Sequence, residues 1–172
     1  MSIIIKRITS KDLNKFFDFF KRTTAAEFPE YSRKKLNFII LTGWNRKRYQ
    51  NLLKQNNRFI LAAWNKNKIV GILDAEQPFW GVCFCCWLMV TKQFQGKGIG
   101  TNLLEKLEKV ASKKGVHMIY LFAYKRNVPY YKKIGYQFVG NMKKSWSGQD
   151  NYIFTKLLRE PKEKNYLKRV RL

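Results

Sequence analysis

Residues Gln95–Gly100, with the sequence QGKGIG, are the part of this chain best suited to hold an anion. They lie between an apolar run, Val82–Val90, and a pattern typical of a helix. The first backbone N–H groups of a helix have no intrahelical partners, and the helix dipole adds positive charge there. Glycines let this backbone approach an oxyanion closely, and Lys97 adds a cation. The spacing predicts an anion-binding loop that suits a diphosphate; the alternative is a glycine-rich turn without a ligand.

Two familiar phosphate-binding loops do not fit these residues. A P-loop has the pattern G-x-x-x-x-G-K-[ST], whereas Gly100 is followed directly by Thr101. The dinucleotide fingerprint has G-x-G-x-x-G, whereas Gly96, Gly98 and Gly100 follow G-x-G-x-G. That fingerprint also places an acidic residue about 20 positions further on, where this chain has Tyr120. The loop therefore belongs to neither class.

A second segment downstream of the loop completes a pair of motifs. Gln95–Gly100 matches the Q/R-x-x-G-x-G/A signature of the GNAT superfamily of N-acetyltransferases. Asn127–Tyr136, NVPYYKKIGY, resembles the second signature of that superfamily, which commonly ends F-Y-x-K-x-G-F/Y. Leu88–Val90 resembles its fourth strand, and the spacing of the two motifs is also similar. The resemblance is specific over residues 88–140 and is one of topology alone over residues 1–57.

The resemblance implies that the anion is the pyrophosphate of acetyl-CoA, used as a co-substrate. The pantetheine arm would run between splayed parallel strands, pair with the backbone near Leu88 and Val90, and contact Asn127. Lys133 would lie near the nucleotide phosphates, although a solvated helix face is an equal alternative. The positions that the resemblance assigns to acetyl-CoA are Leu88, Met89, Val90, Gln95, Gly96, Lys97, Gly98, Ile99, Gly100, Thr101, Asn127 and Lys133.

Tyr131 is the predicted general acid. Acyl transfer from a thioester to an amine needs a neutral amine, a group that stabilises the oxyanion and an acid for the departing thiolate. A backbone N–H near Leu88–Val90 could polarise the carbonyl. Tyr131 stands four residues before Gly135, where the family often has its acid, and a phenol with a pKa near 10 can protonate a thiolate. The alternative is an aromatic residue that only packs, as expected of Tyr130.

Several carboxylates compete for the role of general base. Many relatives carry a glutamate on the fourth strand, but Val82–Val90 contains none. Asp74 and Glu76 lie on the preceding strand, and Glu76 is taken as the tentative base. Glu27 and Glu30 lie in a loop expected to overhang the acceptor. A chain of water molecules without a dedicated base is an equal alternative.

Hydrophobic periodicity predicts the elements that must position these groups. Strands are expected at residues 3–8, 58–64, 68–76, 81–90, 117–124, 136–141 and 152–158. Helices are expected from Ser10, at 32–41, at 46–55, from the loop to Gly115 and at 129–134, with residues 23–30 breaking the first. Strands 81–90 and 117–124 should be parallel because a helix connects them.

The predicted fold class is α/β (α+β). The resemblance implies a GNAT fold: a mixed central sheet of six or seven strands, with splayed parallel strands four and five, flanked by about four or five helices. No repeat or linker divides the sequence, so one domain is expected over residues 1–172, with a basic peripheral tail at 159–172.

The charge of the chain is strongly positive, at +24 from 35 Lys and Arg against 11 Asp and Glu. Such a surface attracts polyanions such as nucleic acid, and it disfavours a polycationic substrate. An A/T-rich genome also enriches lysine without any ligand, although it does not explain the scarcity of carboxylates. A nucleic-acid or ribosomal partner is therefore an open alternative.

The cysteines and the apolar runs exclude other classes of protein. Cys83, Cys85 and Cys86 lack the spacing of a disulfide framework or zinc site, and His117 is too distant to complete one, so no metal is expected. They are interpreted as small buried residues of a strand, with Cys86 as a covalent acyl carrier the minor alternative. The longest apolar run is about half a membrane helix. The protein is expected to be soluble and cytoplasmic, without membrane insertion.

Three functions are compatible with these observations. The first is an acetyl-CoA-dependent N-acetyltransferase acting on a small-molecule or peptide amine. The second is the same reaction on a nucleic-acid-borne or ribosome-associated amine, such as aminoacyl-tRNA, and the third is a non-catalytic acyl-CoA-binding module. Residues 10–57 and 141–151 would determine which acceptor binds. The identity of the acceptor and the oligomeric state of the protein stay open. Four aromatic residues are expected mainly to complete the core, with the lining of an acceptor pocket as the alternative: Phe28, Tyr31, Trp44 and Trp80.

Overall fold

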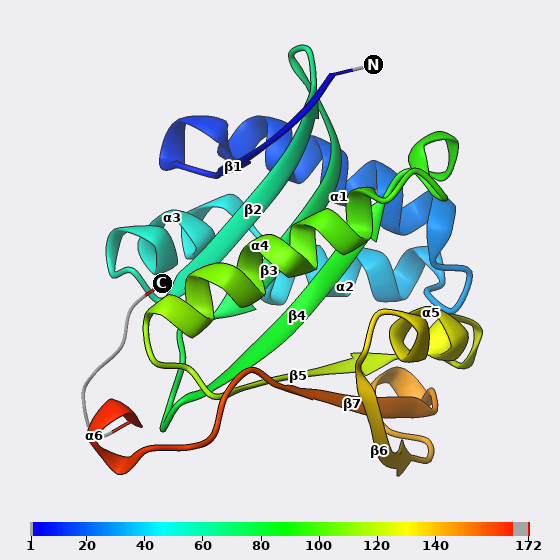
Figure 1. Cartoon of the computed structure of the whole chain (residues 1–172). Coiled ribbons are helices and arrows are strands. Elements are labelled where there is room, and N and C mark those ends of the chain that lie inside the picture. Colours follow the sequence, from blue (N-terminus) through cyan, green and yellow to red (C-terminus); the bar gives the residue numbers. More distant parts are fainter. Residues whose placement is uncertain (1, 167–171) are drawn as a thin grey trace. The chain divides into compact units, whose positions relative to one another are not determined.

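A seven-stranded mixed sheet organises the chain, and Figure 1 labels its elements. The computed structural model describes residues 2–166 and 172. The strand order is β1-β2-β3-β4-β5-β7-β6. The strands are β1 Ile3–Arg7, β2 Arg58–Asn65, β3 Lys68–Glu76, β4 Val82–Val90, β5 Met118–Ala123, β6 Gln137–Met142 and β7 Asn151–Leu157. The helices are α1 Leu13–Glu27, α2 Arg33–Thr42, α3 Arg46–Lys54, α4 Ile99–Lys113, α5 Val128–Lys133 and α6 Glu163–Tyr166. The predicted fold class is confirmed.

The chain divides into two compact units, which are described separately. The first unit comprises Met1–Asp74 and Trp87–Leu104, and the second comprises Ala75–Cys86 and Glu105–Leu172. The described part of the predicted basic tail contains α6, and residues 167–171 of that tail lie outside the described residues.

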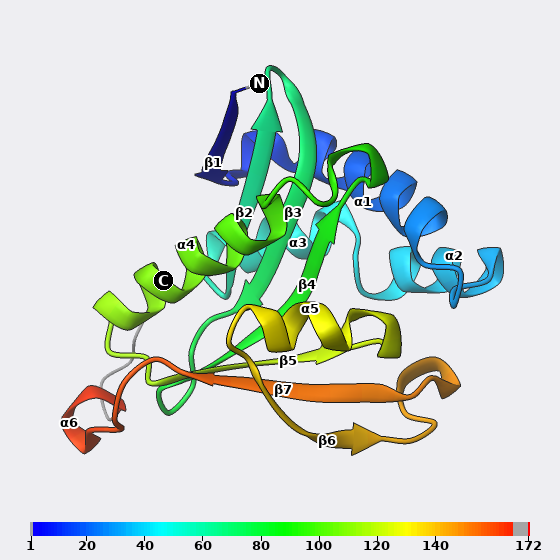
Figure 2. The same cartoon turned by 45° about the vertical axis from the view of Figure 1, so that its right-hand side comes forward.

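The core of the first unit lies between α1 and the strands β2 and β3. Leu13, Phe16 and Phe20 recur at helical spacing on α1 and are at most 1% exposed. Strand β2 is buried at seven of its eight positions, so both of its faces are covered. Figures 1 and 2 show α1–α3 on one face of β2 and β3, with the first turns of α4 on the other. This arrangement explains the continuous apolar run of β2.

Helix α1 extends further than its sequence predicts. Residues 23–30 were expected to break it, but α1 continues to Glu27. Thr23 and Thr24 are buried, and the Thr24 hydroxyl donates to the carbonyl of Phe20 within the helix. The Phe28 backbone N–H then bonds to the Thr24 carbonyl at 3.2 Å. Tertiary burial therefore overrides the weak helix propensity of the threonine pair.

The second unit contains the pairing of β4 with β5. The two strands are parallel, and their register runs from Val82↔Met118 to Cys85↔Leu121. The pairing of β5 with antiparallel β7 continues further, to Ala123↔Tyr152. Among the described residues, β4 and β5 are thus in register over four residue pairs only, and this matches the predicted splay of strands four and five. Strand β6 closes this edge of the sheet through a bulge between Phe138 and Gly140.

Two of the three cysteines are buried on β4, as predicted. Cys83 is 0% and Cys85 3% exposed, whereas Cys86 is half-buried. Burial, followed by the nearby Glu76 carboxylate, raises the pKa of the Cys83 thiol to about 12 from its ordinary value of 9.0. Cys83 therefore stays a neutral thiol in the folded protein at pH values where an exposed cysteine ionises.

We expect the free energy of unfolding to fall as the pH rises from about 9 towards 12. The unfolded chain loses the Cys83 proton near pH 9.0, whereas the folded chain keeps it to about 12. The stabilisation is therefore fully present below pH 9, and each pH unit above it removes up to about 1.4 kcal/mol. Urea titrations between pH 7 and 11 measure this slope. Cys83→Ala should reduce the slope between pH 9 and 10 without changing the slope between pH 6 and 8, and an unchanged alkaline slope would contradict the assignment.

No helix within the described residues is long and apolar enough to cross a membrane. The same residues contain no group of three or more His, Cys, Asp or Glu that could hold a metal ion.

Candidate active site

The loop between β4 and α4 has an open backbone at two of its glycines. Gly96 and Gly98 adopt φ values of +73° and +76°, in the left-handed region where side chains are strained. A Cβ added at either position would meet nothing within 4 Å, so the backbone faces open space. The Asn102 N–H donates to the Gly98 carbonyl at 2.9 Å, so the first turn of α4 follows directly from the glycine loop. This geometry fits a bound diphosphate.

The start of α4 lies close to β3 because of a glycine. A Cβ at Gly71 would come within 3.2 Å of the Ile99 side chain and 3.3 Å of the Met89 carbonyl. Ile99 and Met89 are 3% and 2% exposed. Their side chains therefore belong to the packing of the first unit, and only their backbone could contact a cofactor. Gly71 is a supporting residue that sequence reasoning missed.

The loop is held in place by Glu27 at the end of α1. Its carboxylate accepts from the Lys92 backbone N–H at 3.1 Å and from the Gln95 side-chain amide at 3.4 Å. The Gln95 amide also donates to the Val90 carbonyl at 2.9 Å. The side chain of Gln95 therefore ties the loop to the end of β4. Glu27, considered above as a base, instead has the contacts of a loop-positioning residue.

We expect Glu27→Ala to raise the KM for acetyl-CoA by about tenfold with little change in kcat. The substitution removes the acceptor for Lys92 N–H, and one hydrogen bond to a charged group is worth about 1.5–3 kcal/mol. Glu27→Gln keeps an oxygen in the same place and should stay close to wild type in both constants. Steady-state kinetics at several acetyl-CoA concentrations separates the effects. A collapse of kcat in Glu27→Gln would instead indicate a general base.

The second motif lies in the second unit, around α5. Tyr131 is 6% exposed, and its ring packs against Tyr130, Tyr136 and Phe154. Burial is the largest cause that raises the pKa of Tyr131 well above 10, followed by Cys85 and Tyr130. Tyr131 is thus both a packing residue and a phenol that stays protonated at neutral pH.

A polar network fixes the end of α5. The Tyr136 hydroxyl donates to Glu108 at 3.1 Å, and the Lys156 ammonium donates to the other Glu108 oxygen at 2.7 Å. Lys156 also donates to the Ile134 carbonyl, the C-terminal cap of α5, at 3.3 Å. Asn127 is half-buried before α5, and Lys133 is exposed on it. Their predicted contacts with acetyl-CoA stay predictions.

The carboxylates of β3 have different surroundings. Asp74 is 0% exposed; it accepts a hydrogen bond from the Tyr49 hydroxyl and lies 3.8 Å from the Arg58 guanidinium. This burial makes Asp74 a structural group of the first unit and removes it from the candidate bases. Glu76, at the end of β3, is exposed. Its negative charge is the second cause, after burial, that raises the pKa of Cys83 and of Tyr120. Glu76 is therefore accessible to solvent beside the second unit's part of β4.

An aromatic cluster in the first unit surrounds Trp87, a residue that sequence reasoning missed. The Trp87 ring lies 5.2 Å from Phe20, 5.7 Å from Phe28 and Trp44, and 6.3 Å from Tyr31, between ring centroids. Phe28, Tyr31 and Trp44 were expected in the core and are half-buried in this cluster. Trp80 was also expected in the core, but it is 56% exposed.

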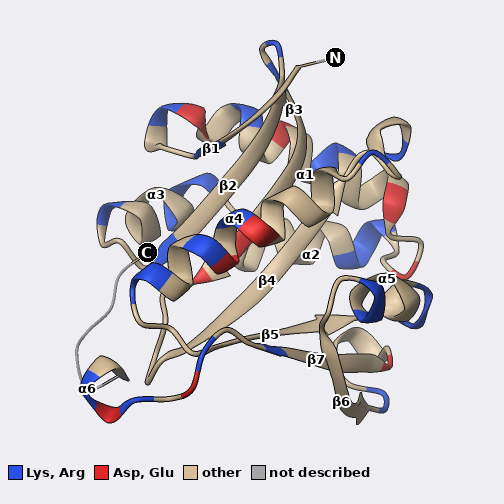
Figure 3. Cartoon of the chain, viewed as in Figure 1, with Lys and Arg blue, Asp and Glu red and all other residues tan. Residues whose placement is uncertain are grey.

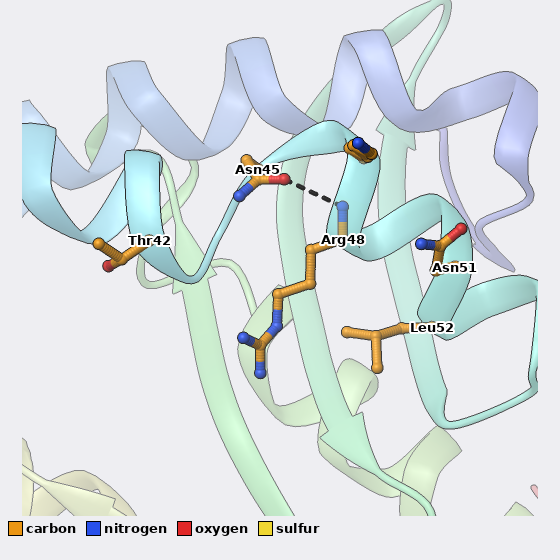
Figure 4. A pocket seen from close by; sticks show the side chains of 6 residues that line it. Thr42, Asn45, Arg48, Asn51 and Leu52 are labelled. Atoms are coloured by element: carbon orange, nitrogen blue, oxygen red, sulfur yellow. Dashed lines mark hydrogen bonds between the residues drawn. The ribbon is translucent and has the colours of Figure 1, made fainter.

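A shallow pocket in the first unit lies where α2 ends and α3 begins. Its volume is about 470 Å³, and its lining consists of Thr42, Asn45, Lys47, Arg48, Asn51 and Leu52. Figure 4 shows the Arg48 side chain beside Leu52, with the Asn45 side chain accepting from the Arg48 backbone N–H at 2.9 Å. The pocket is basic and has no carboxylate in its lining, so an anionic group suits it.

The motifs and the fold agree with one family of enzymes. Residues 16–136 match the Acetyltransferase (GNAT) family. The chain belongs to the GNAT family. It is an N-acetyltransferase, and acetyl-CoA is its co-substrate. A comparison with curated proteins finds no match to this GNAT sequence.

Solved structures share the GNAT fold at low sequence identity. PaiA N-acetyltransferase from Thermoplasma acidophilum, solved with coenzyme A, is 21% identical, covers 91% of this chain and 99% of its own, and gives a TM-score of 0.73. An aminoglycoside 6'-N-acetyltransferase complexed with coenzyme A is 18% identical over 92% and 99% of the chains, with a TM-score of 0.69. A ribosomal-protein-alanine N-acetyltransferase from Brucella melitensis is 18% identical over 90% and 99%, with a TM-score of 0.70.

Proposed function

We propose that this enzyme transfers the acetyl group of acetyl-CoA to a primary amine of a small-molecule or peptide acceptor by direct attack on the thioester. The observation that carries the proposal is the open loop at Gly96 and Gly98, which is fastened to the end of β4 through Gln95. Acetyl-CoA supplies the activated acyl group. The N–H groups of the loop, with Lys97, would hold its pyrophosphate, and the backbone of Leu88 and Val90 would pair with its pantetheine arm.

In this proposal Tyr131 donates the proton that the departing thiolate needs. Its position four residues before Gly135 supports the role. Burial keeps the phenol protonated, because the raised pKa of Tyr131 disfavours the phenolate at neutral pH. A buried acid of this kind is protected from exchange with solvent until it acts.

Glu76 is the proposed base that receives the proton of the acceptor amine. It is the exposed carboxylate at the end of β3, whereas Asp74 is fully buried by Tyr49 and Arg58. An exposed carboxylate can pass a proton to water, so Glu76 could act directly or through one water molecule.

The acceptor is proposed to carry an apolar body or an anionic group. The rings around Trp87 offer an apolar surface, and the pocket at Lys47 and Arg48 offers a cationic one. Solved relatives of the same fold are named for aminoglycoside and ribosomal-protein amines, which illustrates that the fold itself does not determine the acceptor.

Mass spectrometry of an acetylation mixture tests the proposal. The protein is incubated with acetyl-CoA and separate pools of small amines, peptides and aminoacylated tRNA, and each pool is searched for a gain of one acetyl group. Acetylated amines in the first two pools are the expected result. If acetyl-CoA does not raise the melting temperature at about 100 times a micromolar Kd, where about 2.7 kcal/mol of stabilisation is due, the assignment of the loop fails.

A second acceptor class, an amine carried by nucleic acid, is favoured by the distribution of charge. From Tyr31 to Leu73 the sequence contains no Asp or Glu, while Lys and Arg recur throughout. Figure 3 shows these cations on α2 and α3. Acetylation confined to the tRNA pool, with turnover that falls steeply as salt rises, would select this class over the first.

A further inference from the structure

The two-residue turn between Phe79 and Val82 contains a tryptophan where that turn disfavours one. The backbones of Phe79 and Val82 exchange hydrogen bonds of 2.9 and 3.0 Å, as in a β-hairpin. The two central residues, Trp80 and Gly81, have φ values of +52° and +76°. A two-residue turn with both central φ values positive favours Asn, Asp or Gly at its first position, because a Cβ is strained there. The backbone therefore provides no reason for a tryptophan at position 80.

The side chains of this turn do not contribute a buried core either. Phe79 is 76% exposed and Trp80 is 56% exposed. Their rings lie 5.9 Å apart at 81° to each other, so each ring holds the other in an edge-to-face arrangement. A strained backbone that presents two adjacent aromatic rings to solvent indicates a binding role rather than a packing role.

Cations of the second unit lie at the same end as this turn. The Gly81 carbonyl accepts from His117 N–H at 2.9 Å, and the His117 carbonyl accepts from Leu158 N–H at 2.7 Å. The Arg159 guanidinium donates to the Ser112 hydroxyl at 3.0 Å. The end of α4 and the segment that leads to α6 therefore flank the turn, and Figure 3 shows Lys and Arg along both. The exposed cations are Lys113, Lys114, Arg159, Lys162 and Lys164, and the exposed carboxylates are Glu76, Glu160 and Glu163.

We propose that Phe79, Trp80 and these flanking cations form a binding surface for single-stranded nucleic acid. Unstacked bases would lie on the two rings, and phosphates would contact Lys113, Lys114 and Arg159. A single strand presents flat apolar faces and negative charge in every nucleotide, and this matches rings set among cations. A lipid surface needs a larger apolar area that inserts into the membrane together, whereas the end of α4 and the segment that leads to α6 carry several exposed cations.

This surface is separate from the acetyl-CoA loop. The turn precedes the first residue of β4, and the loop follows the last residue of the same strand. Binding of nucleic acid here therefore does not depend on the proposed acetyl transfer, and either could fail without the other.

Fluorescence anisotropy with the full-length protein tests the proposal. The probe is a labelled oligo(U) of about 16 nucleotides, with an RNA duplex of the same length as comparator. The wild-type protein should prefer the single strand, and its affinity should fall as salt rises. Trp80→Gly should weaken binding about 5- to 100-fold, because it removes one stacking ring.

The matched variants separate stacking from folding. Glycine suits the positive φ at position 80, so Trp80→Gly should keep the melting temperature within about 3 °C of wild type. Trp80→Tyr keeps a ring and should bind within about threefold of wild type, while Phe79→Ser should weaken binding in the same direction as Trp80→Gly.

Three kinds of result would overturn the proposal. One is the absence of oligo(U) binding by the wild-type protein. Another is an affinity that is unchanged in Trp80→Gly, or equal for duplex and single strand. The third is loss of binding to phosphatidylcholine–phosphatidylserine vesicles in Trp80→Gly while oligo(U) binding is preserved, which would identify a lipid surface instead.

Discussion

Tyr131→Phe is expected to lower kcat by about 100-fold or more while the KM for acetyl-CoA changes little. The substitution keeps the ring that packs against Tyr130, Tyr136 and Phe154 and removes only the hydroxyl. A positioned general acid contributes about 10²–10⁴ to the rate, so its loss should dominate the effect. Initial rates at saturating acetyl-CoA and acceptor measure kcat directly.

The pH dependence of the rate gives an independent test of Tyr131. Burial raises the pKa of Tyr131 well above 10, so the phenol stays protonated through the neutral and mildly alkaline range. The wild-type rate should show no loss from Tyr131 ionisation below about pH 10.

Tyr130→Phe is the matched control for Tyr131→Phe. Tyr130 is the adjacent residue on α5, is half-buried, and lies 5.0 Å from Tyr131 between ring centroids. Its variant should keep kcat within about twofold of wild type, because it removes a hydroxyl that has no proposed role in proton transfer. Equal rates for wild type and Tyr131→Phe would exclude the acid role and leave Tyr131 as a packing residue.

Asp74→Ala is expected to lower the free energy of unfolding by about 3–5 kcal/mol. The Asp74 side chain is 1% exposed, and its removal takes the ion-pair partner from the Arg58 side chain, which is itself 11% exposed. Breaking a buried pair by removing one member costs about this much, because the remaining charge stays desolvated. Native proteins have a total free energy of unfolding of about 5–15 kcal/mol, so this substitution would remove a large fraction of it. Urea titration at pH 7 measures the change.

A double substitution distinguishes the cost of an isolated charge from the value of the pair. Arg58→Met combined with Asp74→Leu removes both charges and should be less destabilising than Asp74→Ala alone. Asp74→Asn keeps an oxygen that can accept from the Tyr49 hydroxyl, and the folded variant should retain wild-type kcat. A large loss of kcat in folded Asp74→Asn would return Asp74 to the candidate bases.

The parts of the site that the sequence predicts are those determined by local chain geometry. The glycine spacing of Gln95–Gly100 predicts a backbone that approaches an anion, and the structure shows Gly96 and Gly98 with positive φ in open space. Strand and helix order follows from periodicity, and the parallel pairing of β4 with β5 follows from the helix between them. Each of these conclusions needs only residues that are neighbours along the chain.

The parts that sequence reasoning missed depend on residues far apart in the sequence. Glu27 contacts Lys92 and Gln95, which are 65 and 68 positions away. Trp87 stands in an apolar run that resembles any buried strand, and its four aromatic neighbours come from residues 20–44. Trp80 was expected in the core because of its residue type, but the turn at Gly81 exposes it. Composition and local spacing do not predict contacts between residues that are so far apart in the sequence.

The short register between β4 and β5 also has a consequence for the order in which the chain folds. The β2–β3 hairpin has a tight turn and can form on the microsecond scale, whereas a parallel pair must wait for α4 to bring its strands together. Only four residue pairs then hold β4 to β5, so this ladder is expected to close last. Until it closes, the apolar strand Val82–Val90 presents an unprotected edge. Aggregation during synthesis is therefore expected at this stage, and slower expression at low temperature should reduce it.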